Sequence, residues 1–192
     1  RRAVAEASEP LPFYGYHIPE RTGVPLGRDL LSGLLEIPNF AGLKWSDPDL
    51  KALEWDVQTF GDRADLLSGI DELLLPALTR GARGAVGSTY NFLAPWFVSL
   101  WDSCRRGDLA EAERWQAKAN GVIARVTAEE DGISAGKAAT RWAGADCGEA
   151  LAEWQRFYPS ARPVERDRLR ERVTEIAGRL DPSAALKLHA QA

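Results

Sequence analysis

The chain has 192 residues, of which 45% are hydrophobic and 27% are charged, and its formal net charge is −4. This composition is ordinary for one globular domain or a large part of one, and the acidic balance argues against a nucleic acid or an anionic membrane surface as partner. No apolar run approaches the roughly 20 residues that a membrane-spanning helix needs.

Few residues could bind a metal ion. Cys104 and Cys147 stand far apart without a CxxC partner, and two histidines, His17 and His189, cannot form a zinc site alone. We therefore expect no metal, and we expect the cysteines to be free thiols in the reducing cytoplasm.

The first residues, Arg1–Ser8, have the pattern of the end of an amphipathic helix, and the sequence contains no methionine. Because the sequence starts inside an element, we expect it to be a piece of a longer protein.

Short apolar segments alternate with helical ones along the first two thirds of the chain. The strand candidates are Phe13–His17, Ala41–Lys44, Asp65–Gly69 and Gly84–Ser88, and the helix candidates are 27–36, 47–60, 71–79 and 95–105. Four strand–helix units with short loops predict a parallel α/β fold.

Local sequence signals predict where two of these helices begin. Asp47 followed by Pro48 is the usual pattern of an N-cap and a first helical residue. Asp71 is the expected cap of the next helix, where Pro76 should kink or loosen the first turn. After Gly107 only helices are predicted, over 109–127, 137–154 and 167–180.

Polar residues follow the predicted strands at the ends where parallel α/β folds bind their ligands. They are Tyr16, Lys44, Asp71 with Glu72, and Ser88 with Thr89. The convergence of these side chains at one edge predicts a binding site there.

Lys44 is the most informative of these residues. An amine at the rim of a parallel sheet is partly removed from water, which favours its neutral form, and a neutral amine can attack a carbonyl to form a Schiff base. The alternative is a lysine that extends to the edge and pairs with Asp47.

The other polar residues also have two interpretations. Tyr16 could transfer a proton beside an imine, or it could fill the mouth of the fold. Asp71 and Glu72 could bind a ligand, or they could complement the dipole of the helix that starts there. Ser88 could bind a ligand or belong to a turn.

Four segments in order carry a resemblance to a known family. They are Tyr14–Pro19, Gly42–Asp47, Gly69–Glu72 and Gly84–Asn91. Together they resemble the N-acetylneuraminate lyases of the dihydrodipicolinate synthase superfamily, over roughly residues 1–127 and more loosely to about 150. The resemblance implies the second half of a (β/α)₈ TIM barrel over 1–107, followed by a helical region over 108–192 that packs on it.

The resemblance also implies roles for single residues. Lys44 falls on the Schiff-base lysine and Tyr16 on the catalytic tyrosine. The positions that contact the sugar part of the substrate are Ser46, Gly69, Asp71, Glu72 and Ser88. The family implies no metal or organic cofactor, a sugar acid and pyruvate as small-molecule partners, and a homotetramer.

The implied reaction cleaves N-acetylneuraminate to N-acetylmannosamine and pyruvate. Within the same class, dihydrodipicolinate synthesis or the cleavage of another 2-keto-3-deoxy sugar acid remains open. A truncated half-barrel without turnover, serving as an interaction module, is the non-enzymatic alternative. The family segments that precede the strand with the catalytic tyrosine, here Phe13–His17, have no counterpart in this sequence. We therefore expect the polypeptide alone to be poorly stable and to have little lyase activity.

Overall fold

The computed structural model describes Ala5 and residues 11–128 and 132–145. The rest of the helix expected over Arg1–Ser8, the end of the one over 137–154 and the whole of the one over 167–180 lie outside the described residues. Cys147 and His189 lie outside them as well, whereas Cys104 is a half-buried free thiol.

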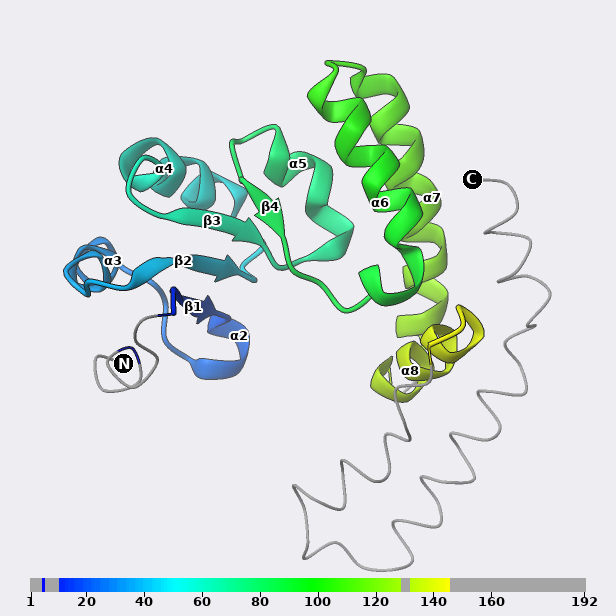
Figure 1. The fold of residues 1–192 in the computed structure, drawn as a ribbon, viewed down its shortest axis with the longest axis horizontal. Coiled ribbons are helices and arrows are strands. Elements are labelled where there is room, and N and C mark those ends of the chain that lie inside the picture. The colour runs from blue at the N-terminus through cyan, green and yellow to red at the C-terminus, as the bar shows by residue number, and fades with distance from the viewer. Residues whose placement is uncertain (1–4, 6–10, 129–131, 146–192) are drawn as a thin grey trace, which may run out of the picture. The chain divides into compact units, whose positions relative to one another are not determined.

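Four parallel strands form the sheet of the described chain. They are β1 (Phe13–His17), β2 (Phe40–Trp45), β3 (Asp65–Ser68) and β4 (Gly84–Ala85), and they lie side by side in chain order. The arrows of β1, β2 and β3 point the same way in Figure 1. This order confirms the predicted parallel α/β fold with consecutive strands as neighbours.

Helices separate the strands and follow them. They are α2 (Pro19–Thr22), α3 (Arg28–Leu35), α4 (Leu50–Phe60), the 3₁₀ helix η1 (Asp71–Leu73), α5 (Leu74–Leu78), α6 (Tyr90–Arg105), α7 (Leu109–Thr127) and α8 (Gly132–Trp142). No helix among the described residues combines the length and the apolar character needed to cross a membrane.

The chain forms two compact units. Unit 1 consists of Arg1–Gly87 and Leu100–Gln116, and it holds the whole sheet; unit 2 consists of Ser88–Ser99 and Ala117–Ala192. The helices α6 and α7 each have residues in both units. The proposed domains 1–107 and 108–192 stay a prediction.

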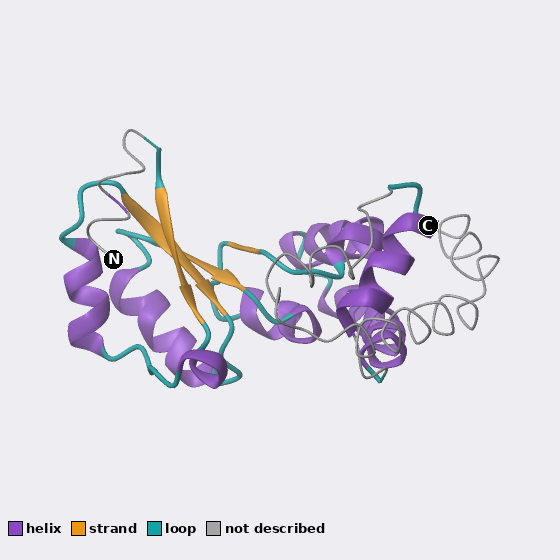
Figure 2. Cartoon of the chain, turned by 90° about the horizontal axis from the view of Figure 1, so that it is seen from below, coloured by secondary structure: helices purple, strands orange, loops and turns teal. Residues whose placement is uncertain are grey.

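The two faces of the sheet differ in what they contact. Side chains alternate along a strand, so one face, here called the helix face, carries His17, Leu43 and Trp45. Its apolar side chains share a buried cluster with Leu31 of α3 and Leu53 of α4, and Figure 2 shows these helices on one side of the strands. The other face, here called the tyrosine face, carries Tyr14, Tyr16, Gly42 and Lys44.

An irregularity in β2 decides which residues share a face. Phe13 pairs with Phe40, but Tyr14 pairs with Gly42, so Ala41 is an extra residue in β2. Such a bulge shifts the alternation of the strand by one position. Phe40 therefore shares the helix face with Leu43, three residues later.

The predicted start of α4 is wrong by two residues. Asp47 is favoured as N-cap by the sequence, but the N-cap is Asp49, whose carboxylate accepts hydrogen bonds from the backbone N–H groups of Lys51 and Ala52 at 3.0 Å. Asp47 instead accepts the N–H of Asp49 at 2.9 Å. An Asp–Pro–Asp sequence offers two candidate caps, and Pro48 lies in the turn between them.

The prediction that Asp71 caps the next helix is also wrong. Ile70 precedes η1 and Leu73 precedes α5, and neither end has a side-chain cap. Asp71 is itself the first residue of η1 and is buried. Pro76 is the third residue of α5, where a backbone N–H would have no partner within the helix, so the proline requires no kink.

The fourth unit differs from the prediction at both of its elements. β4 ends at Ala85 rather than Ser88, and α6 begins at Tyr90 rather than Pro95. The carbonyl of Thr89 accepts the N–H groups of Phe92 and Leu93, which starts the helix early. A proline removes one hydrogen bond from a helix interior, and the buried apolar residues on both sides of Pro95 keep α6 continuous.

Candidate active site

Lys44 and Tyr16 lie next to each other on the tyrosine face. The two residues are register partners near the C-terminal ends of β2 and β1. The Nζ of Lys44 lies 4.3 Å from the centroid of the Tyr16 ring, a distance at which an ammonium group is attracted to an aromatic face. Lys44 is half-buried and Tyr16 is 54% exposed, so both side chains are accessible to a small molecule.

Ser46 extends this pair toward β3. Its Oγ lies 3.5 Å from the Oη of Tyr16 and 3.1 Å from the carbonyl oxygen of Gly69. Since a hydroxyl group has one proton, Ser46 donates to one of these oxygens at a time. The serine therefore links the tyrosine of β1 with the residue that follows β3.

Gly69 provides the space in which these side chains meet. Its N–H donates to the carbonyl of Trp45 at 2.7 Å, which continues the pairing with β2 one residue beyond the end of β3. A Cβ at this position would overlap the Oγ of Ser46 and would lie 3.0 Å from the Cε of Lys44. Only a glycine allows the serine and the lysine to keep their positions.

The phenol of Tyr16 has a shifted acidity. Burial acts to raise its pKa, but hydrogen bonds with Ser46 and Lys44 and the positive charges of Lys44 and Arg21 together bring the pKa below its ordinary value. The phenolate form is therefore more accessible than in a free tyrosine, which suits a group that accepts a proton. Arg21, on α2, was not identified from the sequence.

Lys44 does not pair with Asp47, the alternative that the sequence left open. The Oδ2 of Asp47 lies 3.3 Å from the Nε2 of His17 instead. Lys44 forms no ion pair with any residue of the described ranges.

Asp71 and Glu72 follow β3 in η1, and their surroundings differ. Asp71 is buried, and its carboxylate occupies the space beside Gly87, where a Cβ would overlap it. Glu72 is half-buried. The side-chain amide of Gln116 donates to the carbonyl of Asp71 at 3.1 Å and accepts the N–H of Leu75 at 2.9 Å.

Gln116 was not identified from the sequence, although a signal exists. It stands on the face of α7 whose other members are the buried Ala112, Ala119 and Ile123. A polar residue on a buried helix face needs hydrogen-bond partners, and here these partners hold the segment that carries Asp71 and Glu72.

Ser88 belongs to unit 2 and is exposed. It precedes α6, and its carbonyl accepts the side-chain amide of Asn91 at 2.9 Å. The structure thus brings together Tyr16, Lys44, Ser46 and Gly69, whereas a role for Ser88 in the same site stays a prediction. Within the described ranges no three His, Cys, Asp or Glu side chains are arranged to hold a metal ion.

The family model of the dihydrodipicolinate synthetase family matches residues 1–153. The chain belongs to this family. Among curated relatives, the N-acetylneuraminate lyase of Rattus norvegicus is 44% identical over 140 residues, which are 71% of this chain and 44% of the rat protein. The human N-acetylneuraminate lyase is 44% identical over 118 residues, covering 60% of this chain and 37% of the human protein. The chain thus spans less than half the length of these relatives.

Solved structures agree with the family and confirm the predicted fold. The sialic acid aldolase of Ruminococcus gnavus superposes with a TM-score of 0.75 at 25% identity, over 96% of this chain and 59% of that one. The N-acetylneuraminate lyase of Proteus mirabilis gives 0.69 at 29% identity, over 91% of this chain and 58% of the other. The chain is an α/β fragment of the TIM-barrel fold of this family.

Proposed function

We propose that this chain carries the imine-forming lysine and the proton-transferring tyrosine of a pyruvate-dependent carbon–carbon lyase, with N-acetylneuraminate as substrate. The observation that carries the proposal is the placement of the Lys44 amine 4.3 Å from the Tyr16 ring, at the C-terminal ends of neighbouring parallel strands. In parallel α/β folds this edge is where ligands bind. The likeness to N-acetylneuraminate lyases supports the choice of substrate.

The first step is the attack of the neutral Lys44 amine on the C2 ketone of the open-chain sugar acid. Loss of water gives a protonated imine, which withdraws electrons from the C3–C4 bond. A ring that lies against the amine limits the directions from which a ketone can approach it. Ser46 and Tyr16 border the same space, so the reacting carbon would lie close to the phenol.

The second step is a proton transfer at C4. The phenolate of Tyr16 takes the proton of the C4 hydroxyl group, the C3–C4 bond breaks, and N-acetylmannosamine leaves as an aldehyde. The electron pair moves to the imine and gives an enamine of pyruvate. Protonation at C3 and hydrolysis then release pyruvate and restore the amine. The lowered pKa of Tyr16 supports its role as the base.

The remaining polar residues are proposed to bind the sugar. Asp71 and Glu72 follow β3 directly after Gly69, and Glu72 is accessible enough to accept hydrogen bonds from hydroxyl groups. A site that presents carboxylates favours a polyhydroxyl substrate, whose hydroxyl groups can donate to them, over an apolar aldehyde, which has no such donors. Ser88 is proposed as a further contact to the sugar.

Reductive trapping tests the proposal directly. The chain is incubated with pyruvate and sodium borohydride, digested, and examined by mass spectrometry for a reduced pyruvyl adduct. We expect the adduct on Lys44 and none on the exposed Lys51, and we expect Lys44→Arg to abolish it. A label spread equally over surface lysines would contradict an imine-forming role. Comparing aldehydes as acceptors in the reverse reaction then separates N-acetylmannosamine from other acceptors.

A further inference from the structure

A buried histidine lies behind the lysine–tyrosine pair, on the other face of the sheet. His17 follows Tyr16 in β1 and is 5% exposed. Its ring contacts the ring of Trp45 at a tilt of 54°, with the centroids 4.5 Å apart. His17 and Trp45 are register partners, as Tyr16 and Lys44 are one residue earlier. The two pairs therefore occupy opposite faces of the same strand ends.

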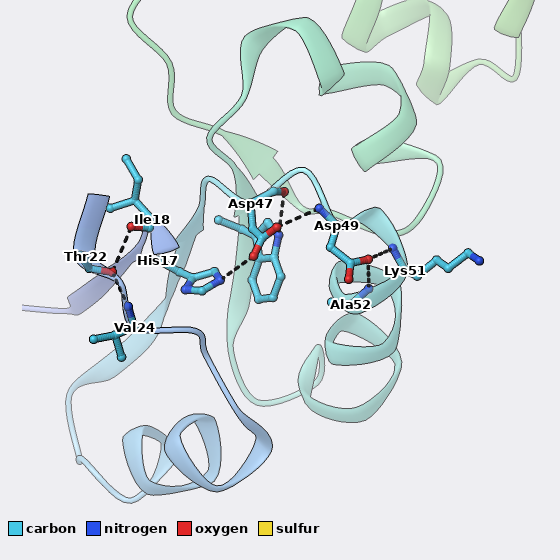
Figure 3. Close-up of polar contacts among 9 residues, drawn as sticks. His17, Ile18, Thr22, Val24, Asp47, Asp49, Lys51 and Ala52 are labelled. Atoms are coloured by element: carbon cyan, nitrogen blue, oxygen red, sulfur yellow. Dashed lines mark hydrogen bonds and ion pairs between the residues drawn. The ribbon is translucent and has the colours of Figure 1, made fainter. Parts of the chain in front are cut away.

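Asp47 connects these strand ends beyond the last residues of the sheet (Figure 3). Its Oδ2 lies 3.3 Å from the Nε2 of His17, and its Oδ1 accepts the N–H of Asp49 at 2.9 Å. Its carbonyl accepts the indole N–H of Trp45 at 3.2 Å. Asp47 therefore ties the turn after β2 to both strands.

Ser46 lies within the segment that these contacts fix. Its N–H donates to the carbonyl of His17 at 2.8 Å, and its Oγ lies 3.5 Å from the Oη of Tyr16. His17 thus holds residue 46 through its backbone and residue 47 through its side chain. A rotation of this turn would move the serine hydroxyl away from the phenol.

We propose that His17 is a positioning residue, which acts through Asp47 to hold Ser46 against Tyr16 beside Lys44. The effect of this positioning on the reaction rests on the proposed function of Lys44 and Tyr16. Its geometric part concerns the contact between serine and phenol and can be measured without substrate. His17 does not touch the substrate space, since its side chain lies on the helix face.

Variants of the pair separate positioning from simple stability. His17→Phe keeps a ring on Trp45 but removes the hydrogen bond, whereas Asp47→Ala removes the carboxylate, and a double variant combines both. Asp47→Asn keeps an acceptor for Asp49 and a partner for His17, so it should rescue. Phe40→Leu is the control, because it disturbs the same two strands at their opposite ends, where Phe40 contacts Phe13.

Two readouts apply to each variant of the full chain. One is the rate of pyruvate trapping on Lys44. The other is the titration of the Tyr16 phenol, taken as the tyrosinate absorbance difference between each protein and its Tyr16→Phe counterpart. We expect His17→Phe and Asp47→Ala each to slow trapping roughly tenfold and to move the phenol pKa back toward its ordinary value. The double variant should be no slower than either single one, since both break the same connection.

The outcomes distinguish the two proposals. Additive losses in the double variant, or an unchanged phenol titration in both single variants, would overturn the positioning role. The same holds if Phe40→Leu shifts the phenol as much as His17→Phe does. If the unaltered chain is not trapped on Lys44 at all, the proposed function fails, while the phenol titration still decides whether His17 positions Ser46.

Discussion

Burial changes the chemistry of Asp56, a single carboxyl group on α4. The residue is 6% exposed, and desolvation raises its pKa to about 6, against the opposing charge of Arg28. Arg28 is partly engaged elsewhere, since its guanidinium lies 3.9 Å from the centre of the Trp55 ring. A carboxylate that keeps its charge at neutral pH in this place costs the folded state free energy.

The sign of the pH dependence follows from that shift. In the unfolded chain Asp56 ionises near 3.8, and in the folded chain near 6, so its contribution to stability falls as the pH rises from about 4 to about 6. We expect Asp56→Asn to raise the free energy of unfolding by about 1–2 kcal/mol at pH 8 and to change it little at pH 4. Urea unfolding at both pH values measures this, and an equal effect at both would contradict it.

Single residues differ in how far the sequence alone could place them. Lys44 and Tyr16 could be placed because the end of a parallel strand is a fixed position in the fold. The pairing of Asp47 with His17 could not, because it depends on which of two candidate caps, Asp47 or Asp49, begins the helix. The contact of Ser46 with Gly69 needs the register of a third strand, which no local pattern gives.

At the scale of elements, α4 shows how one side chain starts a helix. The carboxylate of Asp49 accepts two backbone N–H groups that have no partner within the helix. We expect Asp49→Ala to lower the free energy of unfolding by about 1 kcal/mol, as the loss of an N-cap does. Urea unfolding followed by circular dichroism at pH 8 measures the change.

Asp62, in the exposed turn after α4, provides the matched control for this prediction. Asp62→Ala removes the same side chain at the opposite end of the helix, where a negative charge opposes the dipole. We expect it to be neutral or slightly stabilising. If both variants lost the same free energy, the capping role of Asp49 would be refuted.

Elements with strong periodic patterns were predicted well, and the exceptions have physical causes. The strands β1 and β3 match the expected ranges closely, and so does the helix α7, whose apolar residues recur at helical spacing. α6 begins five residues before the predicted start, since Pro95 has the pattern of a helix start but lies inside the helix. β4 is shorter than the predicted Gly84–Ser88, since only Gly84 and Ala85 pair with residues of β3.

At the scale of the whole molecule, the tyrosine face and the outer strands determine what the polypeptide can do alone. Tyr14 and Tyr16 are both exposed on this face, and in the described chain β1 and β4 are the outermost strands of the sheet. Electrostatic interactions in a site that is open to water are weaker than in a closed one, which slows the reaction. Exposed strand edges also favour association with other chains.

We therefore expect purified 1–192 to cleave N-acetylneuraminate at least about a hundredfold more slowly than a full-length lyase of the family. Coupled detection of pyruvate measures the rate. Adding the part of a relative that this chain does not match should raise it, if that part covers the tyrosine face. Cleavage by 1–192 alone at the rate of a full-length enzyme would contradict the expectation.

The extra residue in β2 has a consequence for how easily such a site is lost or gained. Ala41 is the reason that Lys44 lies opposite Tyr16; with straight pairing from Phe13 and Phe40, the partner of Tyr16 would be Leu43. A gene that gained one codon after this bulge would keep nearly the same composition and family resemblance, yet would direct the amine toward the helices. Among related chains, the spacing between the strand start and the lysine should therefore be a better indicator of chemistry than overall identity.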